Sequence, residues 1–226
     1  MNTDLSTFSA RLRQATRLDH GEAETSAFIT TLMQGERTGA DYVLLLAQYR
    51  PLYAALEAAT AARRDEACVA ELFDPALDRL AAIDSDLPKL AEWAGLDEIP
   101  AVVNSTLAYA RRVEEVGQLE DPSRLVAHHY LRYLGDLSGG LAIGSLVARH
   151  YGVPSEMLSM WSFPAIEKPK VYKDRYRELL DLFAEPSRED AVVEEASLGF
   201  RLNREVFGDL GRVSPMPLAE PVAELA

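Results

Sequence analysis

Apolar residues recur at helical spacing along almost the whole chain. No stretch shows the two-residue alternation of apolar and polar positions, bounded by turn dipeptides, that is typical of a β-hairpin. The pattern therefore predicts an all-α fold. A first helix is expected from about residue 6 to residue 33, ending near Gly35, and a second begins at Thr38, where Asp41 makes a capping-box-like start. Three prolines are then expected to punctuate shorter helices: Pro75, Pro88 and Pro100.

The second half of the sequence predicts three further helices. A long one is expected over residues 124–150 in spite of four glycines, and it should stop at Gly152. The stretch that follows, up to Pro169, is the least regular part of the sequence. Two more helices are expected over residues 171–183 and 188–210. The last part is rich in proline and predicts a loose end: Pro215, Pro217 and Pro221.

Length and charge narrow the classes of protein that fit. A chain of 226 residues suits a single domain, which we expect over residues 1–210, followed by a flexible C-terminal tail over residues 211–226. Acidic residues outnumber basic ones 36 to 23, for a formal net charge of −13, which argues against nucleic acid and against an anionic membrane surface. An anionic ligand is not excluded, because local clusters of Arg and Lys can still hold one.

A single cysteine, Cys68, cannot form an internal disulfide, and its charged neighbours suggest an exposed turn between helices. The first residues have neither a basic segment nor an apolar one, and no window of about 18 uninterrupted apolar residues occurs. The sequence therefore predicts a soluble, cytoplasmic protein.

The first helix carries a possible metal ligand. Its polar stripe follows helical spacing along one face: Arg13, Arg17, His20 and Glu24. The apolar positions Phe8, Leu12 and Ala15 lie on a different side, so His20 is not simply a core residue. One interpretation is a surface histidine paired with Glu24. The other is a metal ligand whose second ring nitrogen is oriented by that carboxylate one turn away. Helical spacing alone leaves both open.

Two common metal sites of helical proteins do not fit the sequence. A dinuclear iron site needs Glu-x-x-His pairs on two helices, but none of the residues three positions before a histidine is a glutamate: Arg17, Leu125, Val126 and Val147. A zinc site is not supported either, because the chain has one cysteine and scattered histidines.

The strongest local signal is a run of glycines inside the long helix: Gly135, Gly139, Gly140 and Gly144. Each glycine costs about 0.5 to 1 kcal/mol relative to alanine, so something must compensate. Gly135 and Gly139 lie one turn apart on the same face, where bare backbone can touch a flat ligand, pack closely against another helix or let the helix bend. Asp136, four residues after Arg132, is expected to be paired and to anchor ordered water.

These residues belong to a longer motif. The segment from residue 127 to residue 140, AHHYLRYLGDLSGG, closely resembles the signature of the heme oxygenase family, and favours its soluble bacterial members. The resemblance also covers LRQAT at residues 12–16 with His20 and Glu24, EEVG at residues 114–117 and FRLN at residues 200–203. The departures replace no required chemical group: Leu141 for glutamine, His129 for alanine, Leu131 for threonine and Arg13 for lysine.

The resemblance implies a helical bundle with heme sandwiched between a proximal and a distal helix. His20 would then be the proximal iron ligand, with Glu24 accepting its outer ring proton. The helix of Gly135 and Gly139 would cover the opposite face and direct dioxygen towards one meso carbon. Asp136 would order water molecules that deliver protons, linked to three neighbours: Arg132, Tyr53 and Asn203.

The heme propionates need partners, and the resemblance suggests Arg13, Lys173 and Arg177 with the hydroxyl of Tyr130. Lys173 and Arg177 are also one turn apart, so a solvated surface pair remains an alternative. Phe200, with Phe163 and Phe207, is suggested as an aromatic wall, although core packing is favoured for each residue taken singly.

The activity implied is oxidative cleavage of heme b, using O2 and external electrons, to biliverdin, carbon monoxide and ferrous iron. We expect a monomer that receives its electrons from a ferredoxin or an NAD(P)H-dependent reductase. A non-catalytic heme carrier or sensor is the main alternative, and Asp136 separates the two, because binding alone does not need it. A helical enzyme of the related thiamine-degrading fold is disfavoured, because Cys68 has no context suited to a nucleophile.

Overall fold

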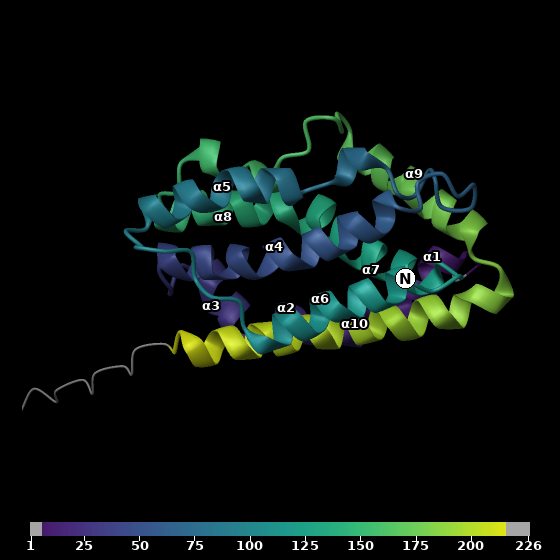
Figure 1. Ribbon diagram of the computed structural model, residues 1–226, viewed down its shortest axis with the longest axis horizontal. Helices are drawn as coiled ribbons and strands as arrows, with labels where there is room; N and C mark the ends of the chain where they lie inside the picture. The colour runs from purple at the N-terminus through teal and green to yellow at the C-terminus, as the bar shows by residue number, and fades with distance from the viewer. Residues whose placement is uncertain (1–5, 216–226) are drawn as a thin grey trace, which may run out of the picture.

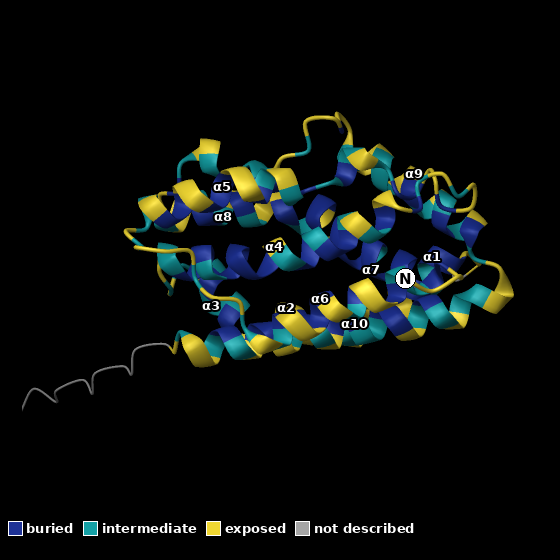
Figure 2. Ribbon diagram, viewed as in Figure 1, coloured by how far each residue is buried: buried dark blue, intermediate teal, exposed yellow. Residues whose placement is uncertain are grey.

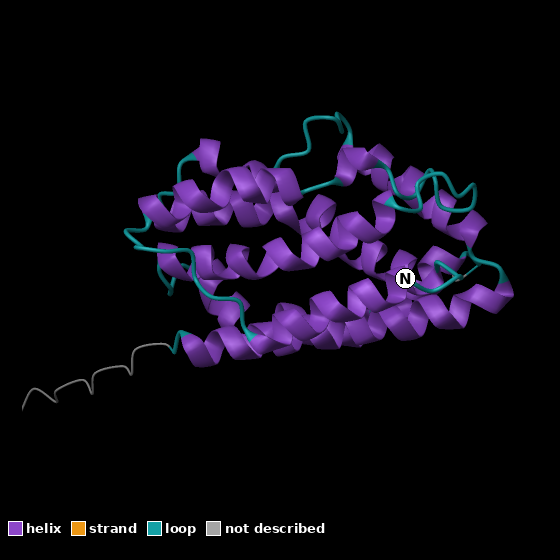
Figure 3. Ribbon diagram, in the orientation of Figure 1, coloured by secondary structure: helices purple, strands orange, loops and turns teal. Residues whose placement is uncertain are grey.

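The computed structural model describes residues 6–215, and within that range it contains helices and no strand, which confirms the all-α prediction (Figure 3). The region predicted as one helix over residues 6–33 is divided into three: α1 (Phe8–Ala15), α2 (Arg17–Glu24) and α3 (Ala27–Gln34). The break after α1 lies at Thr16, whose hydroxyl donates to the carbonyl oxygen of Leu12 at 2.9 Å. Gly35, with a φ of 78°, ends α3 as expected.

The next helices surround the middle of the molecule. The helix α4 (Gly39–Ala61) begins with the predicted capping box of Thr38 and Asp41. Pro75 opens a short 3-10 turn, η1 (Pro75–Leu77), and residues 94–103, which include Pro100, connect α5 (Leu80–Trp93) to α6 (Asn104–Gly117). Pro88 was predicted to separate helices, but it lies inside α5, where buried Leu87 and Leu90 keep the helix packed in spite of the lost hydrogen bond.

The predicted glycine-containing helix is continuous from residue 123 to residue 151. It consists of four segments, of which the middle two are π-helical: α7 (Ser123–His129), η2 (Tyr130–Leu134), η3 (Asp136–Gly140) and α8 (Leu141–Tyr151). Gly152, with a φ of 71°, ends it as predicted. The π-helical turns fall on the glycine-rich part, and such turns are common at functional sites. We call these four segments together the distal helix.

After the distal helix come two short 3-10 turns, η4 (Ser155–Met157) and η5 (Ser159–Trp161), and then α9 (Pro169–Phe183) and α10 (Pro186–Val213). Both long helices start two residues earlier than predicted, because a proline occupies the first position of each. The helix α10 also continues to Val213, three residues into the predicted tail. Residues 1–5 and 216–226, which hold most of that tail, lie outside the described residues.

The helices pack in layers, with α10 along one edge of the molecule and α4 through its middle (Figure 1). The helix α10 contacts α1, α2, α3, α6 and α7, while α4 packs against α5 and α6. Buried residues lie on the inward faces of the helices, and exposed residues follow the outer surface of α10 (Figure 2). Within residues 6–215, no helix is both long and apolar enough to span a membrane.

Cys68 and Ala15, in the first half of the chain, are both exposed. Cys68 is exposed in the turn region between α4 and α5, as expected. Ala15 was expected to share the apolar side of α1, but it is exposed, and that side consists of Phe8 and Leu12.

Candidate functional site

His20 lies on α2 with half of its side chain exposed, and its Nδ1 is 3.3 Å from Oε2 of Glu24. The predicted pairing of these two residues is therefore present. The ring of His20 also meets the ring of Phe200 from α10 edge to face, with centroids 5.3 Å apart. Because Nδ1 faces the carboxylate, Nε2 is the ring nitrogen left for another partner.

A small apolar cluster joins α2 to the distal helix. Its members are Ala23, Leu131 and Phe200, and it is separate from the main core. Ala23 lies three residues after His20, and Leu131 lies four residues before Gly135, so each is about one helical turn from a candidate site residue. The cluster therefore places His20 at the same site as Gly135 and Gly139, which we call the glycine strip, on two different helices.

The glycines of the distal helix divide into two pairs with different surroundings. A Cβ atom added to Gly135 or Gly139 would have no heavy atom within 4 Å, so both positions face open space. A Cβ at Gly140 would lie 2.8 Å from the ring of Trp161, and one at Gly144 would lie 3.2 Å from it. Close helix packing thus explains Gly140 and Gly144. It does not explain Gly135 and Gly139, whose bare backbone lines an open face.

A buried polar network lies behind the open glycine face. The hydroxyl of Tyr53 donates a hydrogen bond to the carboxylate of Asp136. Nη2 and Nε of Arg132 donate to the Tyr53 oxygen at 3.1 and 3.3 Å, and Nη1 donates to Oδ1 of Asn203 at 3.3 Å. The four side chains come from three parts of the sequence, α4, the distal helix and α10, and all are buried. The predicted group is therefore assembled, with Tyr53 as the link between Asp136 and Arg132.

Burial shifts the ionisation of this network. It raises the pKa of Asp136, which the positive charge of Arg132 and the hydrogen bond from Tyr53 only partly offset. It also raises the pKa of Tyr53 well above its usual value, so the phenol stays protonated and can donate. Arg132 stacks over Tyr49 at 4.4 Å, a partner that sequence reasoning missed. The available signal was spacing, because Tyr49 lies one turn before Tyr53 on α4.

The candidate anion-binding residues come from α1, α9 and the distal helix. Nζ of Lys173 is 3.1 Å from the hydroxyl of Ser138, which ties α9 to the glycine-rich segment. Arg177 pairs with Asp174 at 2.7 Å. Burial raises the pKa of the Tyr130 hydroxyl, and the charges of Arg177 and Arg13 oppose that shift, so both cations lie near this tyrosine.

The other three histidines have other surroundings. His128 is buried with Nε2 3.0 Å from Glu195, and His129 is buried with Nδ1 2.8 Å from the hydroxyl of Tyr176. His150 is exposed and lies against Gly35. Across residues 6–215, no group of three or more His, Cys, Asp or Glu side chains is placed to hold a metal ion. His20 therefore remains the candidate for a single ligand beside a flat group.

The three candidate aromatic walls also have defined places. Phe200 belongs to the cluster beside His20, and Phe207 is part of the main core. Phe163 lies under the guanidinium group of Arg79, 3.9 Å from the ring centroid. Of the three, Phe200 is the one that contacts the candidate ligand.

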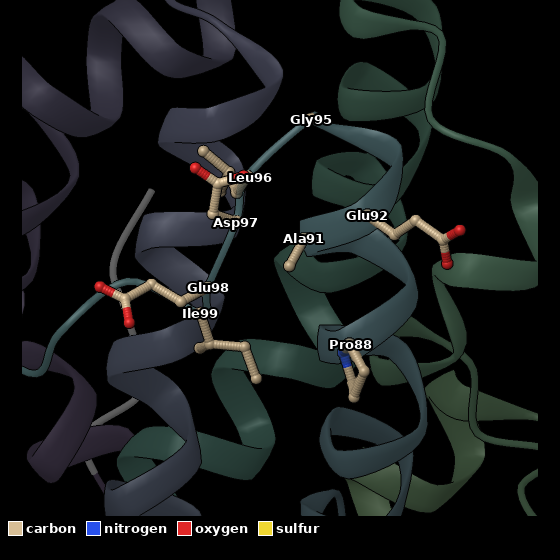
Figure 4. A pocket seen from close by; sticks show the side chains of 8 residues that line it. All are labelled: Pro88, Ala91, Glu92, Gly95, Leu96, Asp97, Glu98 and Ile99. Atoms are coloured by element: carbon tan, nitrogen blue, oxygen red, sulfur yellow. The ribbon is translucent and has the colours of Figure 1, made fainter.

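Two surface hollows lie elsewhere on the molecule. The larger, of about 470 Å³, lies between the end of α5 and residues 95–99, where Pro88, Ala91 and Ile99 face the gap (Figure 4). The smaller, of about 280 Å³, lies between α9 and residues 70–75. Neither is lined by His20 or by the glycines of the distal helix.

Taken together, residues 6–215 form an all-helical fold whose candidate site joins His20 on α2 to the open glycine face of the distal helix. Residues 6–209 match the sequence model of the heme oxygenase family. The chain therefore belongs to the heme oxygenase family, enzymes that degrade heme.

Curated relatives with this name are similar over most of their length. Heme oxygenase 1 of Rattus norvegicus is 35% identical, over 93% of this chain and 72% of its own. Heme oxygenase 2 of Synechocystis is 30% identical, over 98% of this chain and 90% of its own. The crystal structure of Synechocystis heme oxygenase-1 in complex with heme superposes with a TM-score of 0.82, 27% identity and coverage of 92% of this chain and 95% of the other. The structure of heme oxygenase from Leptospira interrogans superposes with a TM-score of 0.82 and 28% identity, covering 90% of this chain and 99% of the other.

Proposed function

We propose that heme b is held between α2 and the distal helix and is cleaved with O2 and external electrons to biliverdin, carbon monoxide and ferrous iron. The observation that carries the proposal is the open face at Gly135 and Gly139, joined to His20 through the cluster of Ala23, Leu131 and Phe200. Solved relatives bound to heme support the choice of ligand. When bound, heme supplies the iron at which O2 is activated and is itself the substrate.

His20 would hold the heme iron through Nε2, because Nδ1 faces Glu24 at 3.3 Å. A carboxylate that accepts the outer ring proton fixes the tautomer and makes the imidazole a better ligand. On the other side, Gly135 and Gly139 would let the helix backbone approach the porphyrin closely. Because their space is open, a flat ring fits where any side chain would intrude.

Asp136 would control proton delivery near the open face at Gly135 and Gly139. Its raised pKa and its bond from Tyr53 suit a group that orders water and passes protons to it. Arg132 holds the Tyr53 oxygen in place and is itself fixed by Asn203. Removal of Asp136 should therefore affect turnover more than binding.

The heme propionates would lie towards α1 and α9. Lys173 is anchored beside the glycine strip by Ser138, and Arg13 and Arg177 act on the same tyrosine, Tyr130. Two or three cations around one neutral hydroxyl form a suitable partner for a pair of carboxylates. We further propose a monomeric, cytoplasmic enzyme supplied with electrons by a ferredoxin or an NAD(P)H-dependent reductase.

The test is an optical titration with hemin, followed by addition of reductant in air. We expect a Soret band that saturates at one hemin per chain, and its conversion to biliverdin during turnover. His20→Ala should abolish the saturable ligation, while His150→Ala, which removes an exposed histidine elsewhere, should leave it intact. A heme complex that forms through His20 but persists under turnover conditions would instead favour the carrier or sensor.

A further inference from the structure

His129 and Tyr176 form a buried pair that joins the distal helix to α9. Nδ1 of His129 is 2.8 Å from the hydroxyl oxygen of Tyr176, and the two rings are parallel within 5°. Both side chains are buried. Burial lowers the pKa of His129 to about 3, so its imidazole is neutral and Nδ1 accepts the tyrosine proton.

The position of this pair matters because of its neighbours. His129 directly precedes Tyr130, and Tyr176 lies on α9 between Lys173 and Arg177. The hydrogen bond therefore lies where the distal helix, which carries Tyr130, meets α9, which carries Lys173 and Arg177. Lys173 reaches Ser138 on the distal helix, 3.1 Å away, from the same stretch of α9.

The helix α9 also borders a hollow, and Tyr176 is among the residues that line it. The hollow of about 280 Å³ separates α9 from residues 70–75, with Ala70 and Pro75 facing Leu179 across it. Two side-chain contacts bridge that hollow: the hydroxyl of Tyr172 donates to Oδ2 of Asp74 at 2.8 Å, and Nη2 of Arg175 donates to Oε2 of Glu71 at 2.8 Å. The helix α9 also packs against α1, and the hydrogen bonds of Tyr176 and Lys173 are the ones that tie it to the distal helix.

We propose that His129 is a positioning residue, which through Tyr176 sets the place of Lys173 and Arg177 and so the in-plane orientation of bound heme. The inference rests on the proposed function. A shift of the two cations rotates a heme held by its propionates about the axis normal to the ring. The rotation changes which meso carbon lies beside the glycine strip, and therefore where the ring opens.

The test compares variants at His129. His129→Leu removes the acceptor, while His129→Asn places an amide oxygen close to the former Nδ1. We expect His129→Leu to weaken hemin binding by about threefold to tenfold, because the variant loses one hydrogen bond that positions α9. It should also turn a single biliverdin isomer into a mixture, measured by chromatography. His129→Asn should restore both, a rescue that lost stability alone would not produce.

Three further variants make the test specific. Tyr176→Phe keeps the ring and removes the hydroxyl, and should reproduce the effect even where His129→Leu folds poorly. Lys173→Ala should weaken hemin binding, and adding His129→Leu to it should cost less than the two single effects combined. Leu90→Ala, a buried substitution in α5, should lower stability and leave the isomer pattern unchanged.

Two results overturn the inference: unchanged hemin affinity and isomer pattern in both His129→Leu and Tyr176→Phe, or fully additive effects of His129 and Lys173. Wild-type protein that binds hemin and yields no biliverdin contradicts the proposed function instead. In that case the affinity measurements still decide whether His129 acts through α9.

Discussion

Alanine substitutions at two neighbouring glycines should have opposite effects on the folded protein. At Gly139 an added Cβ meets nothing within 4 Å, so the substitution loses no packing. The helix gains about 0.5 to 1 kcal/mol because alanine surrenders less backbone entropy than glycine. At Gly140 the same atom lies 2.8 Å from Trp161, so the ring must move. Such overpacking costs about 1 to 3 kcal/mol.

The affinity for heme should respond in the opposite way: the stabilising substitution at Gly139 should weaken binding, and the destabilising one at Gly140 should hardly change it. The methyl group of Gly139→Ala would occupy the open face where the porphyrin is proposed to lie, and a clash of about 1 to 3 kcal/mol corresponds to a loss of roughly 5-fold to 150-fold in affinity. Gly140→Ala points its methyl group towards Trp161, away from that face. Its affinity for hemin should stay within about threefold of wild type, measured below its unfolding temperature.

The assay combines thermal unfolding of the heme-free protein with a hemin titration of the same samples. For a chain of this size, the expected stabilisation at Gly139 raises Tm by about 1 to 4 °C, whereas Gly140→Ala lowers it. A protein that is stabilised and yet binds hemin poorly cannot be explained by general damage. The reasoning would be refuted if Gly139→Ala lowered Tm as Gly140→Ala does, or if it bound hemin normally.

Three other predictions concern the polar groups. Asp136→Ala should leave hemin affinity within about twofold of wild type and suppress biliverdin formation, read from the absorbance spectrum during turnover; an unaffected biliverdin yield would contradict the role of Asp136. The pKa of His129 falls from 6.5 unfolded to about 3 folded, so the free energy of unfolding should drop by about 1.4 kcal/mol per unit between pH 6 and pH 5. His129→Leu should flatten that part of the urea midpoint profile, and parallel profiles would refute this assignment. Burial opposes ionisation of Glu195, but hydrogen bonds from Arg112, His128 and Arg124 hold its pKa well below the usual range. The ionised carboxylate therefore stabilises the fold fully above about pH 4.5, and this stabilisation is lost progressively as the pH falls further. Glu195→Gln should therefore cost about 2 to 4 kcal/mol at pH 7 by chemical denaturation, and a loss below 1 kcal/mol would show that the arginines find other partners.

Much of the fold could be predicted from the sequence because the signals were local. The capping box at Thr38 and the glycine stops at Gly35 and Gly152 depend on backbone geometry within a few residues. The division of the first predicted helix was not visible, because apolar spacing continues through Thr16. Pro88 was misjudged for a similar reason, since tertiary packing of its neighbours outweighs a local preference.

The candidate site was likewise predictable only where local sequence determines it. Spacing alone left His20 as a surface residue or a ligand, and family resemblance supplied the roles of Asp136 and its partners. The meeting of Tyr53 with Asp136, 83 positions apart, depends on how α4 crosses the distal helix, which no local pattern contains. The separate roles of the glycines likewise depended on where Trp161 lies.

The shortness of α2 has a consequence for how the molecule exchanges its ligand. This eight-residue helix buries Ala23 and little else, and interruptions at Thr16 and Thr25 isolate it from its neighbours along the chain. Its local free energy of opening must be small compared with that of α4, whose side chains fill the core. An iron ligand carried on such a segment can detach without unfolding of the domain. If His20 is the iron ligand, as proposed, local opening of α2 would let heme enter and let an opened, more flexible product leave.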